Sequence, residues 1–349
     1  MELSRLPKKE KKLRILLLAH ATLVPPDHVS PADSAKAEWR TEYELLKTLR
    51  GLGHEVQAVG LGDDLSILDP CEAQLQPHIV FNLMEEFDGV GFFDQNIVSY
   101  FELRKIRYTG CNPRGLMLAR DKALAKKILA FHGIRTPPFE VYRRKAPFHR
   151  PRAHGLQFPL IVKSVNEEAS LGLSQASVVA DVAALEERIR FLHGRMHTDA
   201  LAENYIEGRE LYVGILGNLR PQTLPVWELQ LDGLPSPRSR IATRRVKWDE
   251  NYRKRHRIVS GPAQGLEDRV AARADQIARA AYQALGLTGY ARMDLRLTPD
   301  GELYLLEANP NPHIGADEDF AQSAQSAGVP YPELVSRILQ LGLRWEPVR

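Results

Sequence analysis

The sequence predicts an α/β fold that begins with a mostly parallel sheet. Short apolar runs at 13–19, 54–59 and 78–83 alternate with a helical pattern near 38–49. Strands that alternate with helices usually form a parallel sheet, and ligands bind beyond the carboxyl ends of its strands. We therefore expect a first α/β module at residues 13–112.

A second module, of α+β type, is expected at residues 113–205. It begins with a helical pattern at 116–132, which ends at Gly133, since glycine commonly follows the last turn of a helix. Two strand patterns and one helical pattern follow, at 158–165, 201–206 and 181–193. Strands that flank a single helix predict a compact unit.

The third module, residues 206–345, is also predicted to be α+β. It contains a strand pattern at 211–216, a stretch rich in Pro and Arg at 235–262, and a helical pattern at 267–285. A hairpin is expected at 290–309, because Asp300-Gly301 separates two strand patterns and Asp-Gly is a strong hairpin signal.

Composition limits the classes of protein that this chain can belong to. The 349 residues are 44% hydrophobic and 26% charged, without a long apolar run, which argues against a membrane span and against disorder. A net charge of +3 does not favour nucleic acid or an anionic membrane as a partner. The apolar run at 15–19 is too short for an export signal. We expect a cytoplasmic protein, in which Cys71 and Cys111 are reduced thiols.

The hairpin carries the most informative pattern of polar residues. If Asp300 and Gly301 form a two-residue turn, Asp294 faces Glu307 and Arg292 faces Asn309. Side chains alternate between the faces of a strand, so all four project from one side. Opposed carboxylates repel unless a cation lies between them, and carboxylate and amide oxygens suit Mg²⁺. The alternative is an ordinary charged solvent face.

Two lysines and two loops are candidates for binding a nucleotide. Lys163 ends an apolar run and needs an anionic partner such as phosphate. Lys122 shares a helical stretch with other lysines, which by itself is typical of a solvated surface. The loop at 166–172 could fold over phosphates with the Ser170 hydroxyl, and in the linker at 203–210 a carboxylate could accept bonds from ribose. Taken singly, both loops look like ordinary surface turns.

Together these features resemble the ATP-grasp superfamily, and within it the D-alanine–D-alanine ligase family, over nearly the whole chain. The matching landmarks are Val80-Phe-Asn-Leu83, Tyr108-Thr-Gly110, Asp121-Lys122, Phe158-Pro-Leu-Ile-Val-Lys163, Ile206-Glu-Gly-Arg-Glu210, Gly289-Tyr-Ala-Arg-Met-Asp294 and Leu306-Glu-Ala-Asn-Pro-Asn-Pro312. The resemblance implies a Rossmann-like parallel N-terminal domain, followed by central and C-terminal α+β domains that sandwich ATP.

The resemblance also implies roles for individual residues. It implies that Lys122 and Lys163 contact the phosphates, that Glu203 and Ile206 lie beside adenine, and that Glu210 binds the ribose. It implies that Asp294, Glu307 and Asn309 bind Mg²⁺ or Mn²⁺, and that Arg292 stabilises the tetrahedral intermediate. A substrate carboxylate would attack the γ-phosphoryl group of ATP, and an amine would attack the resulting acyl phosphate. The expected partners are therefore a small carboxylate and a small amine. Because the family is often dimeric, the resemblance also favours a homodimer.

The basic segment 238–257 occupies the place of the family's mobile active-site loop. It contains nine Lys or Arg residues around Trp248 and Tyr252. We interpret it as a lid that excludes water and brings Lys247 to the γ-phosphate. An RNA-binding arm or a solvated run of charges would have a similar composition.

Other positions depart from the family pattern. The first strand leads into Leu18-Ala-His-Ala-Thr-Leu-Val-Pro25 instead of a Gly-Gly turn, Met84-Glu85 replaces a His-Gly pair, and an acidic run at 313–319 replaces small hydroxyl residues. This acidic run predicts a cationic or larger nucleophile in place of D-alanine, although it could simply begin a solvated helix. Alternative functions are a kinase-like phosphotransferase and a nucleotide-binding protein without catalysis.

Overall fold

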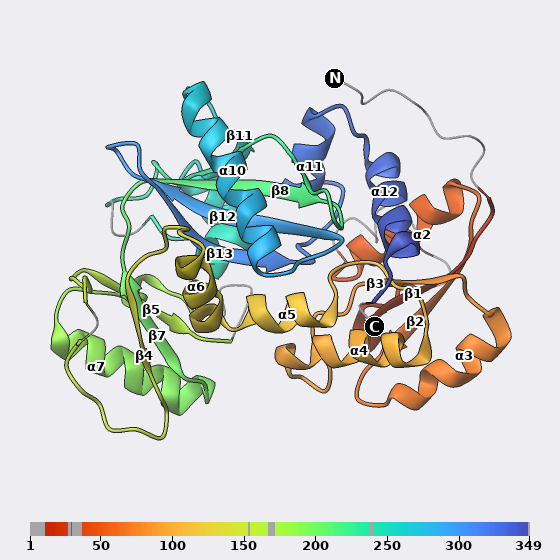
Figure 1. Cartoon of the computed structure of the whole chain (residues 1–349), viewed down its shortest axis with the longest axis horizontal. Coiled ribbons are helices and arrows are strands. Elements are labelled where there is room, and N and C mark those ends of the chain that lie inside the picture. Colours follow the sequence, from red (N-terminus) through yellow and green to blue (C-terminus); the bar gives the residue numbers. More distant parts are fainter. Residues whose placement is uncertain are drawn as a thin grey trace.

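The computed structural model describes residues 11–26, 29, 37–152, 154–166, 172–236 and 240–347. In these ranges the strands form three sheets, which Figure 1 shows in sequence colours. Within the same ranges, no helix is both long and apolar enough to cross a lipid bilayer. The α/β class expected from the sequence is confirmed.

The first sheet is parallel, in the order β2-β1-β3. Its strands are β1 (Arg14–His20), β2 (Glu55–Leu61) and β3 (Ile79–Asn82), and the helices around it are α2 (Arg40–Gly51), α3 (Leu68–Leu75) and α4 (Asp94–Arg104). Successive residues of β1 enter different hydrophobic clusters: Leu16 and Leu18 pack on one side, Ile15 and Leu17 on the other. Burial on both faces explains why this strand reads as a continuous apolar run.

The end of the chain returns to this first sheet. Helix α12 (Tyr331–Arg344) packs against α2 and β3, so that its Leu334 and Ile338 share a cluster with Ile15. Helix α11 (Asp319–Ser326) precedes it. Although 206–345 was predicted as one module, its last helix therefore contributes to the core of the first sheet.

The helix predicted at 116–132 is in fact two helices. Helix α5 (Pro113–Arg120) ends before Asp121, which is extended (φ −80°, ψ 93°), and α6 (Lys122–Phe131) follows. The Asp121 carboxylate accepts a hydrogen bond from the Leu124 N–H at 2.9 Å and so caps α6. The break places Lys122 at the first position of a new helix instead of in the middle of a long one.

The second sheet is antiparallel, in the order β4-β7-β5-β6. Its strands are β4 (Phe139–Tyr142), β5 (Leu160–Ser164), β6 (Val178–Val179) and β7 (Ala200–Asn204). Helix α7 (Val182–Phe191) covers one face through Leu185 and Ile189, and α6 meets Val165 and Leu201 through Ala123. The predicted strands and helix of this unit are confirmed, with ends shifted by a few residues.

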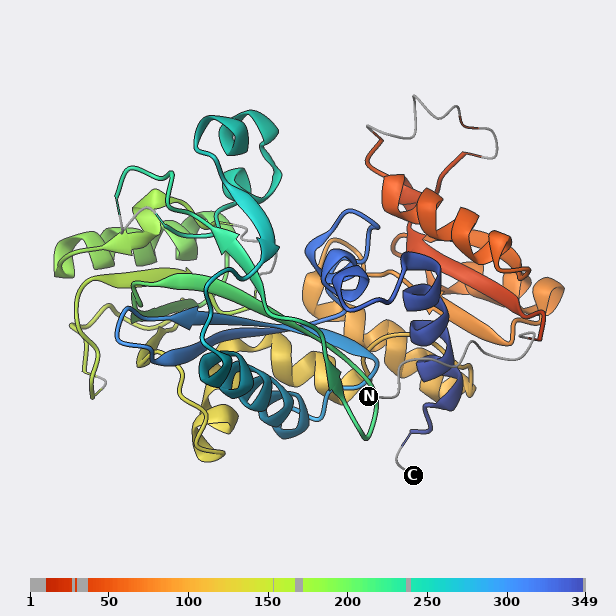
Figure 2. The same cartoon turned by 90° about the horizontal axis from the view of Figure 1, so that it is seen from above.

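The third sheet runs β11-β10-β8-β12-β13, with β9 paired to β8. Its strands are β8 (Arg209–Leu216), β9 (Gln222–Thr223), β10 (Trp227–Gln230), β11 (Val259–Pro262), β12 (Tyr290–Leu297) and β13 (Leu303–Pro310). Figure 2 shows α10 (Asp268–Ala284) on one face, with α8 (Arg244–Trp248) and α9 (Glu250–Arg255) standing above the other. The remaining short helices are Ala21–Leu23, Leu65–Ile67, Gly91–Phe93, Gln175–Ser177 and the π-helix Leu192–Met196.

The third sheet meets the first at a glycine contact. A Cβ atom at Gly289 would lie 2.4 Å from the carbonyl oxygen of Gly110, so the close approach requires glycine there. Next to it, the Asn311 side chain accepts a hydrogen bond from the Cys111 N–H at 2.8 Å. These contacts bring the end of β13 to the edge of the first sheet.

Candidate active site

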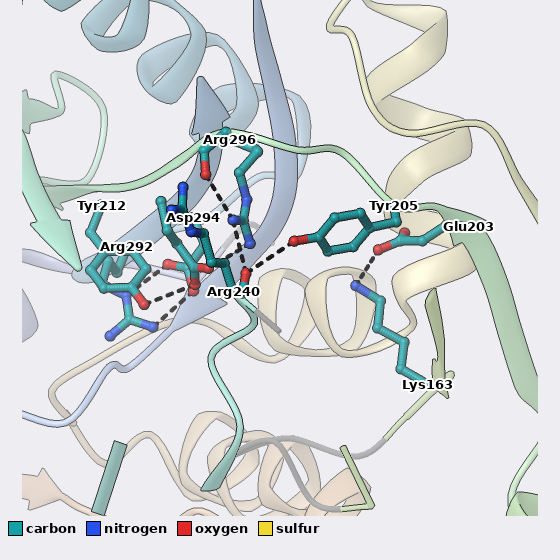
Figure 3. Close-up of polar contacts among 10 residues, drawn as sticks. Lys163, Glu203, Tyr205, Tyr212, Arg240, Arg292, Asp294 and Arg296 are labelled. Atoms are coloured by element: carbon teal, nitrogen blue, oxygen red, sulfur yellow. Dashed lines mark hydrogen bonds and ion pairs between the residues drawn. The ribbon is translucent and has the colours of Figure 1, made fainter. Parts of the chain in front are cut away.

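A cavity between the second and third sheets collects most of the residues predicted to bind a nucleotide. It is lined by Lys122, Lys163, Glu203, Ile206, Glu210, Lys247, Asp294, Glu307 and Asn309, together with Ser164, Leu173, Tyr205, Ile241, Ala242 and Arg296. Figure 3 shows the Lys163–Glu203 pair at one end of this group and the Arg292–Asp294 pair at the other. Ser170 lies outside the described residues.

The carboxylates of Asp294 and Glu307 lie on facing positions of the hairpin, as predicted, but the strand register that brings them there differs from the predicted one. Asp294 pairs with Glu307 and Arg292 with Asn309. The turn, however, is longer than two residues, because the Thr298 N–H bonds the Glu302 carbonyl at 2.9 Å around Pro299-Asp300-Gly301. A β-bulge then shifts the register between Asp294 and Leu295, so that Leu306 has no partner in the pairing. The bulge compensates for the longer turn and restores the predicted pairs.

Arg292 holds Asp294 with two parallel hydrogen bonds. Its Nε lies 2.7 Å from Oδ1 and its Nη2 lies 2.9 Å from Oδ2, while the guanidinium stacks 4.4 Å from the centre of the Tyr212 ring. Burial raises the pKa of the Asp294 carboxyl, and Arg292 counteracts only part of this rise. Arg292 is thus connected to the cavity by its hydrogen bonds to Asp294, which lines the cavity.

Glu307 is paired with a different cation. Lys122 Nζ lies 3.1 Å from Glu307 Oε1. Burial acts to raise the pKa of Glu307, but the charges of Lys122, Lys163 and Lys247 outweigh it and lower this pKa to about 2. Beside it, Nδ2 of Asn309 has no hydrogen-bond partner among the described residues. The amide is therefore still able to turn either its oxygen or its nitrogen toward a ligand.

The donor chemistry at this hairpin fits Mg²⁺. Two carboxylates and one amide on facing strands can offer oxygen ligands, which a hard divalent cation prefers. Over the ranges that the structure covers, no group of three or more His, Cys, Asp or Glu side chains is arranged to hold a metal by itself. Mg²⁺ usually keeps several waters and binds phosphates beside one or two carboxylates, which is compatible with the donors of this hairpin.

Glu203 lies between two lysines, of which the sequence singled out only one. Its carboxylate is 2.7 Å from Lys163 Nζ and 2.9 Å from Lys126 Nζ. Lys126 is only 2% exposed and also donates to the Leu306 carbonyl at 3.2 Å, so the solvated surface suggested for this helix is wrong for Lys126. The spacing of Lys122 and Lys126 held the signal, because residues four apart share a helix face.

The charges of this triad depend on one another. Burial lowers the pKa of Lys126 despite the nearby Glu203 carboxylate. Burial acts in the same direction on Lys163, yet Glu203 and Glu307 outweigh it and raise the pKa of Lys163. Both lysines hold the pKa of Glu203 below its ordinary value, although burial opposes them. Glu203 therefore stays ionised.

Glu210 is buried and bound by a residue that the sequence reasoning missed. Arg296 Nη2 donates to Glu210 Oε2 at 2.7 Å, and the Tyr212 hydroxyl donates to Oε1 at 3.0 Å. Arg296 also donates to the carbonyl oxygens of Gly208 and Arg240, each at 3.1 Å. The alternation that places Arg292 and Asp294 on one face of β12 extends to Arg296, and this was the signal that could have revealed it.

The described part of the predicted lid contains two short helices, α8 and α9, and α8 borders the cavity. Thr243 caps α8 through the Val246 N–H at 3.4 Å, and Lys247 on this helix lines the cavity beside Asp294 and Glu307. The cavity measures about 110 Å³, whereas ligand pockets usually span about 300–1,000 Å³. The cavity is therefore smaller than a typical ligand pocket, and α8 forms part of its wall.

A second, larger cleft lies between the first sheet and the loop after β4. Its volume is about 1100 Å³, and it is lined by Glu42, Glu85, His313, Arg143 and Arg144 among other residues. Two of the departures from the family pattern face this cleft. One is the stretch that begins at the end of β1, where His20 Nε2 lies 3.5 Å from Glu86 Oε1, and the other is Glu85, which follows β3. The acidic run is divided, since Asp317 pairs with Arg40 at 3.0 Å and Glu318 with His313 at 3.5 Å. Asp319 is the first residue of α11.

Comparisons with known proteins agree with this arrangement. The family model described as "D-ala D-ala ligase C-terminus" matches residues 128–340. A D-alanine–D-alanine ligase of Bordetella petrii is 31% identical over 252 residues, 70% of this chain and 71% of the relative. An uncharacterised protein of Sinorhizobium fredii is 30% identical over 307 residues, 86% of each chain.

Solved structures extend the likeness to the whole fold. The D-alanine–D-alanine ligase of Bacillus anthracis complexed with ATP superposes with a TM-score of 0.71 at 22% identity, covering 95% of this chain and 98% of that one. For the ligase of Coxiella burnetii the TM-score is 0.69 at 17% identity, with 96% and 94% covered.

Proposed function

This chain belongs to the D-alanine–D-alanine ligase family, and on that premise we propose that it is an ATP-dependent ligase that joins a carboxylate to an amine. The observation that carries the proposal is one cavity in which Lys122, Lys163 and Lys247 surround Glu307. Lysines and a bound Mg²⁺ neutralise the negative charge of a triphosphate, so several lysines beside oxygen donors suited to Mg²⁺ support ATP binding at this cavity.

The proposed reaction has two steps. A substrate carboxylate oxygen attacks the γ-phosphorus of ATP, and ADP leaves. The amine nitrogen then attacks the carbon of the acyl phosphate, loses its proton, and inorganic phosphate leaves. The side chains make no covalent bond, so their contribution is to position the reactants and neutralise charge.

Each charged residue of the cavity has a proposed place in this scheme. Lys122 and Lys163 bind phosphate oxygens and leave their carboxylate partners when ATP enters. Asp294, Glu307 and Asn309 would hold Mg²⁺, which supplies positive charge between the phosphates when it is bound. Arg292 is proposed to stabilise the oxyanion that forms when the amine adds, because its guanidinium is fixed by Asp294 and by the Tyr212 ring.

The base of the nucleotide is assigned to the other end of the cavity. Ile206, Tyr205 and Ile241 offer apolar surface there for adenine. Glu210 is proposed to accept bonds from the ribose hydroxyls, which requires it to keep only part of its contact with Arg296. Lys247 is proposed to reach the γ-phosphate when the lid closes, and Ser170 to bind it from the loop after β5. We further propose that the enzyme acts in the cytoplasm, where ATP is available. We also propose that it forms a homodimer, as the family resemblance implies.

D-alanine is not the amine substrate that we propose. Glu318 and its neighbours present negative charge at the place where the family has small hydroxyl residues. This charge repels a carboxylate and favours a cationic or larger nucleophile. Asp317 is bound by Arg40, Glu318 by His313, and Asp319 begins a helix. We base the proposal on Glu318, because a histidine partner carries a charge only when it is protonated, whereas an arginine is always charged.

A product screen tests the proposal. The purified enzyme is incubated with ATP, Mg²⁺ and a mixed pool of amino acids and amines, and products are identified by mass spectrometry while phosphate release is followed. An amide with a matching amount of ADP and phosphate is expected. A phosphorylated hydroxyl compound would point to a phosphotransferase, and robust turnover with D-alanine alone would overturn the proposed amine class.

A further inference from the structure

Glu42 is a buried carboxylate that faces the large cleft. It lies in the first turn of α2, is 7% exposed, and lines both this cleft and a smaller adjoining chamber. Its Oε2 has no hydrogen-bond partner among the described residues. Burial raises the pKa of Glu42. An unpartnered buried oxygen is costly to the fold, which favours a ligand that satisfies it.

The surroundings of Glu42 carry more negative than positive charge. His313 lies between Thr41 and Glu318, with Nε2 3.2 Å from Thr41 Oγ1 and Nδ1 3.5 Å from Glu318 Oε1. Burial lowers the pKa of His313, but Glu318, Glu85 and Glu42 together raise it above its ordinary value. His313 is thus a basic group beside three carboxylates in this part of the described structure. Gly315 permits this packing, because a Cβ there would lie 3.0 Å from Thr41 Oγ1.

The other cations of the cleft do not cancel this charge. Arg120 lines the cleft, but its Nη2 and Nε lie 2.5 and 3.0 Å from Oδ2 of the buried Asp94. Arg143, Arg144 and Lys145 follow β4 in the chain, so they come from the wall that the second sheet provides. The cleft is therefore acidic on the side of the first sheet and basic on the side of the second. A carboxylate donor suits the basic side, and a cationic amine the acidic side.

We propose that the acidic wall binds an ammonium group of the amine substrate that is not the reacting amine, so that this substrate is a diamine or a basic amino acid. This inference rests on the ligase function proposed above. The reacting nitrogen must be neutral to use its lone pair, whereas an aliphatic ammonium has an ordinary pKa of about 10.4 and nearby carboxylates raise it. A nitrogen held by Glu42 and Glu85 therefore stays protonated, and a second nitrogen must carry out the attack.

Calorimetric binding to the full chain, in the presence of ADP and Mg²⁺, tests this inference. The probes are 1,3-diaminopropane, propylamine and β-alanine, which share a three-carbon length but end in an ammonium, a methyl group and a carboxylate. The diamine is expected to bind at least tenfold more tightly than either of the others. Glu42→Gln is expected to reduce that preference to less than threefold, and Glu38→Gln, an exposed glutamate of the same cleft, to leave it unchanged.

Several results would overturn the inference: equal affinities for the diamine and propylamine, no measurable binding of the diamine, or a preference that survives in Glu42→Gln. The melting temperature of each variant is measured first, and Glu85→Gln serves as the second test if Glu42→Gln does not fold. Binding of ADP separates the two proposals. An enzyme that binds ADP and forms amides from monoamines, without preferring diamines, refutes this inference and leaves the ligase standing.

Discussion

Asp294 on β12 faces Glu307 on β13, and each of these carboxylates is bound by its own cation, Arg292 for the first and Lys122 for the second. The pair would repel if both charges were left alone. Two sources of positive charge, one from the hairpin itself and one from α6, therefore offset this repulsion within one cavity.

Asp294→Asn is expected to reduce kcat by about 10²–10³-fold, a loss typical of removing one electrostatic contact from an active site. The amide keeps an acceptor for Arg292, so the melting temperature is expected to change by only a few degrees. Phosphate release and thermal unfolding measure the two effects. Glu302→Gln, a half-buried position at the turn of the same hairpin that pairs with Arg135, is the control. Activity close to that of the unmodified enzyme in Asp294→Asn would show that the metal has been misplaced.

Lys126→Met is expected to destabilise the fold by about 3–5 kcal/mol, as is typical when one partner of a buried ion pair is removed. Glu203 would then keep only Lys163, which is also proposed to bind ATP. Urea unfolding gives the stability, and ADP titration gives the nucleotide affinity. Lys127→Met provides a neighbouring exposed lysine for comparison. If both variants unfold at the same urea concentration, the triad does not stabilise the protein.

Lys247→Ala is expected to lower kcat by about 10²-fold while leaving the free energy of unfolding unchanged, because we propose that this side chain of the lid acts on the charge that develops during the reaction. Lys254→Ala removes a lid lysine whose side chain is exposed and pairs only with Glu250 in the described structure. Steady-state phosphate release compares the two variants. Equal losses in both would indicate a general charge effect of the basic segment instead of a specific contact.

Glu42→Gln is expected to be more stable than the unmodified protein at neutral pH, by about 1 kcal/mol or more. A carboxyl whose folded pKa is raised contributes stability at low pH and loses it as the pH rises through the folded pKa. The difference between the two proteins should therefore be smallest near pH 4 and grow toward pH 8, as His313 also loses its charge. Urea unfolding across this range measures it. A difference that does not vary with pH would mean that Glu42 has a partner in the folded protein.

The hairpin shows how much of the site can be predicted from the alternation of side chains along a strand. Strand alternation correctly placed Asp294, Glu307, Arg292 and Asn309 on one face, although the turn was predicted one residue too short. Two irregularities cancelled: the longer turn and the bulge at Leu306. A bulge leaves little trace in a sequence, because it depends on how neighbouring strands pack rather than on the residues of the strand alone.

Lysine positions illustrate what local pattern cannot decide. Lys122, Lys126 and Lys127 read alike in a helical stretch, yet the first two are buried and the third is exposed. The difference comes from Asp121, which starts a new helix, and from Glu203 and Glu307, which lie far along the chain. The roles assigned to these residues stay proposals until they are tested.

By itself, the sequence determined the class of fold, several of its strands and helices, and the residues that line one face of the hairpin. These follow from interactions between residues close in the chain, where periodicity and turn residues act. Only the tertiary structure decided that Lys126 meets Glu203, that Arg296 meets Glu210, and that Glu42 and Glu85 share a cleft with His313. Such contacts join residues that are distant in the chain, so they depend on how the sheets and helices pack together.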